Sequence, residues 1–141
     1  MAVYVWVAVG SALGGLARFA LTRLMEGVSL QFPWGTVCVN VLGCFVIGFF
    51  GTLTLHQGRY PVSDNMRLFV MVGICGGFTT FSSFSLQTFD LLRAGAWWRA
   101  LLNVGLSVML CLVAVGLGHR MAQRTSADVA IAQTVDEELT G

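Results

Sequence analysis

The sequence carries very little charge: only 11% of its 141 residues are Asp, Glu, Lys or Arg, and lysine is absent altogether. Soluble domains contain about 25% charged residues, so this chain has too few to cover a water-soluble fold. The net charge of +1 provides no field that would attract nucleic acid or an acidic substrate. A GxxxxGK[ST] phosphate loop is also absent. Nothing in this composition is typical of a soluble enzyme.

The spacing of the cysteines also argues against a zinc site or a redox motif. The four cysteines form no CxxC pair, and neither histidine lies close to one of them in the sequence. Zinc sites and redox motifs need such spacings, so both functions are disfavoured. Small apolar packing is the favoured role of Cys38, Cys44, Cys75 and Cys111.

Hydrophobic residues, by contrast, make up 56% of the chain. Uncharged stretches at 27–58, 68–89 and 100–119 each supply the roughly 20 apolar residues that cross about 30 Å of hydrocarbon. A further uncharged stretch, 2–17, has no basic residues before it and reads as a retained helix rather than a cleaved signal. The sequence therefore predicts an all-α membrane protein with four transmembrane helices. These helices are expected at about 3–24, 34–55, 66–92 and 97–120.

The four helices would form one transmembrane domain over residues 1–120. Residues 121–141 are polar and end in an acidic run, so we expect a flexible tail there. Arginine counts on the two membrane faces are nearly equal, and either orientation should insert with similar probability. The residues compared are Arg23, Arg93 and Arg99 on one face and Arg59, Arg67, Arg120 and Arg124 on the other. Dual insertion would suit an antiparallel dimer; one fixed orientation set by other features is the alternative.

The third hydrophobic segment contains an unusual stretch, GGFTTFSSFS at 76–85. Paired glycines followed by β-branched threonines are poor material for a continuous helix. In hydrocarbon, irregular backbone survives only where protein buries it or where it lines a polar cavity. We therefore predict that the third helix is broken at mid-span and exposes carbonyl groups that could coordinate a cation. A straight helix whose hydroxyls bond to the i−4 carbonyls is the alternative.

Polar residues also follow narrow tracks on three otherwise apolar helices. The tracks are Thr36, Asn40 and Gly43; Phe81, Phe84, Ser85 and Thr88; and Asn103, Ser107 and Cys111. Polar groups in a membrane interior mark either an interhelical hydrogen bond or a pathway, and three tracks favour a pathway. No Asp or Glu lies deep in any predicted helix, and Glu26 and Asp90 are near segment ends. Hydrogen-bond donors and phenyl ring edges without acids favour an anion. The deepest charge, Arg18, either snorkels to the interface or lines a vestibule.

Three motifs together resemble the CrcB/Fluc fluoride-channel family: GGLARF at 14–19, GTVCVNVLGCFVIGF at 35–49 and GICGGFTTFSSFS at 73–85. The resemblance covers nearly the whole chain except the tail. It implies an antiparallel, dual-topology homodimer in the bacterial inner membrane, surrounded by lipid, that passively exports fluoride and is not an enzyme. It further implies a structural sodium ion at the dimer centre.

The resemblance also implies roles for individual residues, by motif position. The carbonyls of Gly76 and Thr79 would hold the sodium ion. The fluoride pathway would comprise the Asn40 amide, the ring edges of Phe81 and Phe84, and the polar groups of Ser82, Ser107, Thr36 and Arg18. Two departures leave details of the polar track open: Gln87 stands where the family often has Glu, and Cys111 where it has a second serine.

Two other functions compete with a fluoride channel. A small dual-topology exchanger of the multidrug-resistance type also has four helices, but it needs a membrane-embedded carboxylate that this sequence lacks. A non-transporting membrane assembly protein would leave the three polar tracks without a use.

Overall fold

The computed structural model describes residues 1–54, 60 and 62–140, and for residues 126–140 it describes the helical backbone alone. Within this part of the chain, four helical stretches are long and apolar enough to cross a membrane. They are Ala2–Leu24, Trp34–Leu53, Asp64–Arg93 and Trp97–Thr125. The four predicted transmembrane helices are thereby confirmed, the first three with closely similar bounds. Residue 55, the predicted end of the second helix, and Arg59 lie outside the described residues.

The described elements are all helical. In chain order they are α1 Ala2–Leu24, η1 Glu26–Val28, α2 Trp34–Leu53, α3 Asp64–Arg67, η2 Leu68–Cys75, α4 Gly76–Phe78, α5 Phe81–Arg93 and α6 Trp97–Thr140. The segment η2 is π-helical, with a wider turn than an α-helix. The third span thus consists of α3, η2 and α4, followed after an interruption by α5.

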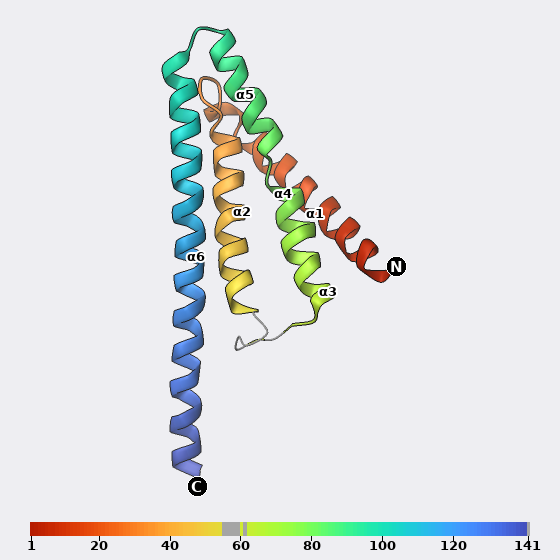
Figure 1. The fold of residues 1–141 in the computed structure, drawn as a ribbon, viewed down its shortest axis with the longest axis vertical. Coiled ribbons are helices and arrows are strands. Elements are labelled where there is room, and N and C mark those ends of the chain that lie inside the picture. Colours follow the sequence, from red (N-terminus) through yellow and green to blue (C-terminus); the bar gives the residue numbers. More distant parts are fainter. Residues whose placement is uncertain (55–59, 61, 141) are drawn as a thin grey trace.

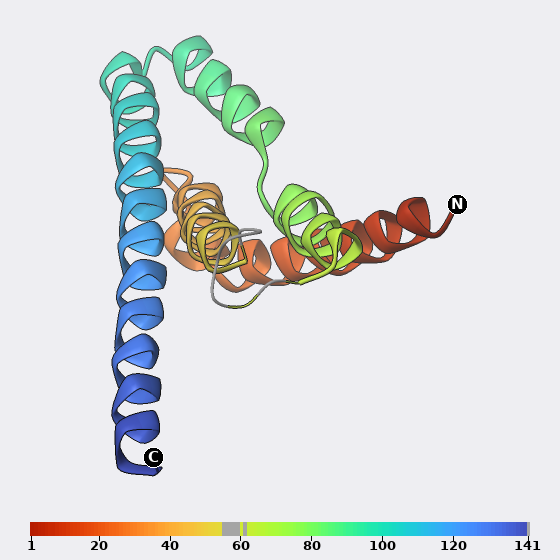
Figure 2. The same cartoon turned by 60° about the horizontal axis from the view of Figure 1, so that its bottom comes forward.

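The spans form two packed pairs. α2 lies against α6, and α1 lies along η2 and α4 (Figures 1 and 2). α5 runs from the interruption to the turn that precedes the start of α6. The turn between α5 and α6 contains Gly95 at φ 73°, in the left-handed region that glycine adopts without strain. Because this turn is short, α5 and α6 meet as antiparallel neighbours at one end of the molecule.

Glycines allow the backbones to approach closely in both pairs. A Cβ atom built on Gly14 of α1 would meet the backbone carbonyl of Ile74 and would lie 2.8 Å from the Phe78 nitrogen. A Cβ atom built on Gly48 of α2 would lie 2.5 Å from the Val115 carbonyl oxygen of α6. Packing of this kind drives helix association in lipid, where hydrophobicity gives no preference for protein over acyl chain.

The fourth helix does not end where the sequence predicted. We expected it to stop near residue 120, before a flexible tail, but α6 continues to Thr140. No proline or glycine lies between Arg120 and Thr140, and Ala, Gln, Arg and Glu in this stretch are good helix formers. A change from apolar to polar composition marks where the helix leaves the hydrocarbon, and this change alone does not end a helix.

Candidate functional site

The third span is interrupted at Thr79 and Thr80, which confirms the predicted break. Both residues have extended backbone, with φ −76° and ψ 158° at Thr79 and φ −152° and ψ 110° at Thr80. α4 ends at Phe78 and α5 begins at Phe81. Thr80 is the N-cap of α5, because its Oγ1 accepts a hydrogen bond from the Ser83 N–H at 3.1 Å.

The side chain of Asn40, on α2, closes the break from the opposite side. Its Oδ1 accepts from the Thr80 N–H at 2.7 Å, and its Nδ2 donates to the Thr80 carbonyl at 3.1 Å. Since the Thr80 N–H requires an acceptor and the carbonyl requires a donor, this pair fixes the orientation of the amide. The pair uses one of the two amide N–H groups of Asn40, so the second can donate to another acceptor.

The break takes the carbonyls of Gly76 and Thr79, among others, out of the helical hydrogen-bond ladder. In a continuous helix the N–H groups of Thr80 and Ser83 would donate to the carbonyls of Gly76 and Thr79. They donate instead to the side chains of Asn40 and Thr80. Gly76 is exposed on the surface of the single chain, and Thr79 is half-buried. Gly76 and Thr79, the two residues predicted to hold a cation, are thus among those whose carbonyls lose their helical partners at the break.

Arg18 lies close to the Thr79 carbonyl. Its side chain is half-buried, and Nη1 donates to the Thr79 carbonyl over 3.5 Å, from α1 to the break. This long hydrogen bond places a positive charge beside the interrupted backbone. Arg18 lines neither of the two cavities described below.

A cavity of about 350 Å³, here called the inner cavity, adjoins the break. Six of the nine site residues predicted from the sequence line it: Asn40, Gly76, Thr79, Phe81, Phe84 and Ser107. Its other lining residues are Gly43, Cys44, Ile47, Met71, Cys75, Thr80, Val108 and Cys111. Side chains from α2, η2, α5 and α6 thus meet in one space, and this lining set contains no carboxylate.

Aromatic rings and hydroxyls occupy separate walls of the inner cavity. The ring centroids of Phe81 and Phe84 are 5.4 Å apart with a 45° tilt, and Phe81 is 79% exposed in the single chain. On α6, the Ser107 hydroxyl donates to Asn103 Oδ1 over 3.5 Å. Buried Asn103 in turn donates to Thr88 Oγ1 at 2.8 Å, which joins α6 to α5. The two rings and the Ser107 hydroxyl thus line the same cavity, and Ser107 belongs to a hydrogen-bond network between α5 and α6.

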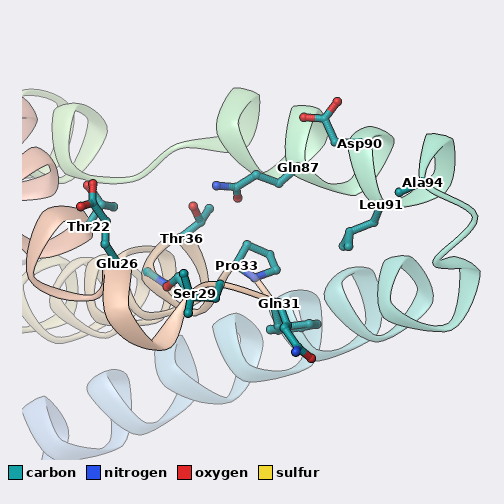
Figure 3. A pocket seen from close by; sticks show the side chains of 13 residues that line it. Thr22, Glu26, Ser29, Gln31, Pro33, Thr36, Gln87, Asp90, Leu91 and Ala94 are labelled. Atoms are coloured by element: carbon teal, nitrogen blue, oxygen red, sulfur yellow. The ribbon is translucent and has the colours of Figure 1, made fainter.

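A second cavity of about 470 Å³, here called the mouth cavity, lies toward the end where α5 and α6 meet (Figure 3). Thr36 and Gln87 line it, together with the carboxylates of Glu26 and Asp90. Thr36 precedes Asn40 by one helical turn, so a single face of α2 runs from the inner cavity to the mouth cavity. On α5, Phe84 of the inner cavity and Gln87 of the mouth cavity are three residues apart and also share one helical face. The two carboxylates stay at the mouth, as their positions near segment ends predicted.

Gln87 carries an unusual acceptor at this mouth. Its Oε1 atom is buried and has no hydrogen-bond partner among the described residues. Buried polar atoms without partners are costly, and a water in the mouth cavity would satisfy this one. Gln87 therefore marks the place where the apolar interior gives way to hydrated space.

Two residues depart from the expected arrangement or were not foreseen. Ser82 is exposed and lies outside both cavities, with its hydroxyl 3.2 Å from Thr80 Oγ1. Thr80 itself was not among the predicted site residues, although it caps α5 and binds Asn40. An N-cap threonine three residues before Ser83 was the available signal, since Ser and Thr favour that position.

A multi-pass membrane protein with a carboxylate-free cavity beside a broken helix is the class that this fold and site define. Residues 5–119 match the family model described as CrcB-like protein, Camphor Resistance (CrcB). The chain belongs to this CrcB family, as its motifs predicted.

Three named relatives align with most of this chain. The fluoride-specific ion channel FluC of Gluconobacter oxydans is 60% identical over 134 residues, which cover 94% of this chain and 93% of the relative. The protein of the same name from Methylobacterium radiotolerans is 58% identical over 133 residues, with 94% and 93% coverage. That of Methylocella silvestris is 58% identical over 120 residues, with 84% and 92% coverage.

Proposed function

We propose that this protein is a fluoride-specific channel that lets fluoride leave the cytoplasm passively across the bacterial inner membrane. One observation carries the proposal: Asn40, Phe81, Phe84 and Ser107 line a single cavity whose lining has no carboxylate. The three relatives above share the name fluoride-specific ion channel FluC, which supports fluoride as the ion. An inside-negative potential of 100 mV favours the exit of a monovalent anion by about 2.3 kcal/mol, so no energy-coupling site is required.

Fluoride would exchange its water shell for protein donors in the inner cavity. The second N–H of the Asn40 amide would supply a hydrogen bond, and the Ser107 hydroxyl would supply another once it turns from its long 3.5 Å bond to Asn103 Oδ1. The rims of Phe81 and Phe84 would supply positive ring edges. Each replaces part of the hydration, while none is a full charge that would trap the ion. Passage would continue to the mouth cavity along the α2 face that ends at Thr36.

The remaining predicted residues would act nearer the break. We infer that Arg18 raises the local anion concentration from beside Thr79, since it is the positive charge closest to the interrupted backbone. Ser82 would act through Thr80 Oγ1, with which it shares a hydrogen bond, rather than by direct contact with the ion.

A second copy of the chain would complete the site. The break at Thr79 and Thr80 lies at mid-span beside exposed Gly76, and irregular backbone at that depth needs protein around it. An antiparallel homodimer would bury this surface, and the near-equal arginine counts on the two faces support dual insertion. Carbonyl oxygens are hard donors suited to Na⁺, so those of Gly76 and Thr79 from two copies would hold one structural sodium ion.

Reconstituted liposomes test the channel directly. Vesicles loaded with potassium fluoride should release fluoride to an ion-selective electrode as soon as valinomycin provides a path for potassium, with no dependence on a pH gradient. Release that needs a proton gradient or a drug substrate would indicate an exchanger. No release from protein of native size would indicate an assembly role. Vesicles loaded with chloride should retain it.

A further inference from the structure

Four sulfur-bearing side chains line the inner cavity, and the proposed fluoride pathway uses none of them. They are Cys44 of α2, Met71 and Cys75 of η2, and Cys111 of α6. Sulfur is a soft donor that selects soft cations such as Cu(I), and it has no donor group strong enough to bind a hard halide. This set therefore has a chemistry different from that of Asn40 and the phenyl rings.

Two of the thiols lie at matching positions on neighbouring helices. Cys44 of α2 and Cys111 of α6 both line the inner cavity, and each precedes by four residues one partner of the close contact between Gly48 and Val115. That contact is tight, because Gly48 allows the Val115 carbonyl to come within 2.5 Å of where a Cβ atom would be. The two cysteines thus lie on a closely packed helix pair.

We propose that Cys44 and Cys111 form a two-coordinate site for a soft monovalent cation of the Cu(I) or Ag(I) type. No cluster of three or more Cys, His, Asp or Glu side chains in the described part of the chain could hold a metal ion. That excludes a tetrahedral zinc-type site, but a linear site with two sulfur ligands needs only this pair.

Binding neutralises the charge that would otherwise be buried. Ag⁺ replaces the proton of one thiol to form a Cys–S–Ag bond, and that proton leaves to water. The second sulfur donates a lone pair and keeps its proton, and no electron is transferred. The resulting complex is neutral, so it avoids the desolvation cost of a net charge in the membrane interior.

The site lies directly beside the fluoride donors. Cys44 follows Asn40 by four residues on α2, and Cys111 follows Ser107 by four residues on α6. One helical turn is about 5.4 Å, so a cation between the sulfurs would occupy the inner cavity next to both donors. Occupation should therefore block fluoride passage. The block rests on the proposed function, whereas cation binding does not.

Silver is a suitable probe because its fluoride salt is soluble, provided that every buffer is free of chloride. Purified protein is equilibrated with AgNO₃, desalted, and analysed for silver per chain by elemental mass spectrometry. Fluoride efflux from liposomes is measured in parallel, with and without micromolar Ag⁺. The variants are Cys44→Ala, Cys111→Ala and the double substitution. Cys38→Ala is the matched control, since Cys38 is also on α2 but does not line the cavity.

Wild-type protein and Cys38→Ala should retain about one silver ion per chain, and Ag⁺ should slow their efflux at least about tenfold. The double variant should lose both effects, with silver affinity reduced at least roughly tenfold. Silver retention by the double variant at the wild-type level would overturn the site. Silver bound at this pair without slower efflux would overturn the block alone. If wild-type vesicles release no fluoride even without silver, the channel function fails, and silver retention still decides the site. Size-exclusion profiles exclude misfolded variants from the comparison.

Discussion

Substitution of Asn40 should affect stability and conduction by separate routes. Asn40→Ala removes both hydrogen bonds to the Thr80 backbone and leaves the buried Thr80 N–H without a partner, whereas the Thr80 carbonyl keeps the first hydrogen bond of α5. One unsatisfied buried group should cost about 1–3 kcal/mol of unfolding free energy. A clearly lower melting temperature of the detergent-solubilised protein is the expected result.

Asn40→Asp should act mainly on the ion. The carboxylate keeps an acceptor for the Thr80 N–H, but it cannot donate to the Thr80 carbonyl and it faces the inner cavity. A unit charge about 4 Å from a passing anion repels it by about 4 kcal/mol at an effective dielectric constant of about 20. Added to the barrier, this repulsion slows passage about a thousandfold. Fluoride efflux should fall to the level of protein-free liposomes.

Asn65 offers matched controls for both substitutions. It lies on the short helix α3 and lines neither cavity. Asn65→Ala should melt near the wild-type temperature, and Asn65→Asp makes the same charge change away from the pathway and should conduct fluoride normally. Wild-type efflux through Asn40→Asp, or an unchanged melting temperature of Asn40→Ala, would refute the role assigned to this amide.

Three further perturbations test other parts of the structure. Phe81→Ile keeps the bulk but removes the ring edge, so fluoride efflux should fall at least about tenfold; efflux at the wild-type rate would rule out ring-edge coordination there. Gly14→Ala places a methyl group against backbone and should destabilise by about 1–3 kcal/mol, as read from thermal unfolding. Gly15→Ala, with open space around it, should stay within about 1 kcal/mol of wild type. Arg67→Met removes hydrogen bonds to the carbonyl and hydroxyl of Thr54 at the end of α2 and should cost about 2–3 kcal/mol by the same measurement; equal stability would show that this cap is dispensable.

Removal of sodium gives one test of the completed assembly. A sodium ion held between two copies would stabilise the folded dimer in proportion to its occupancy. Protein purified with N-methylglucamine in place of sodium should therefore melt at a lower temperature, and added Na⁺ should restore it. Identical melting in both salts would argue against a resident sodium ion.

Hydrophobic segment length predicted the four spans well, because membrane thickness leaves few alternatives. The break at Thr79 and Thr80 was predicted less securely, since propensity alone also allowed a straight helix with back-bonded hydroxyls. Its decisive cause lies outside the segment: the Asn40 amide supplies the partners that the interrupted backbone needs. The sequence of the third span alone does not reveal that contact. The fourth helix continues past the predicted end for a related reason, because polar composition after residue 120 does not by itself stop a helix.

The contact between Asn40 and Thr80 also bears on which ion the cavity accepts. A primary amide can present either its oxygen to a cation or its N–H groups to an anion. Here the Thr80 N–H holds Oδ1 at 2.7 Å, so the end of the side chain left for the cavity is an N–H donor. In an unbroken helix the Thr80 N–H would bond within its own helix, and Asn40 could turn its oxygen to the cavity. In the proposed channel, the break would therefore favour an anion over a cation at this amide.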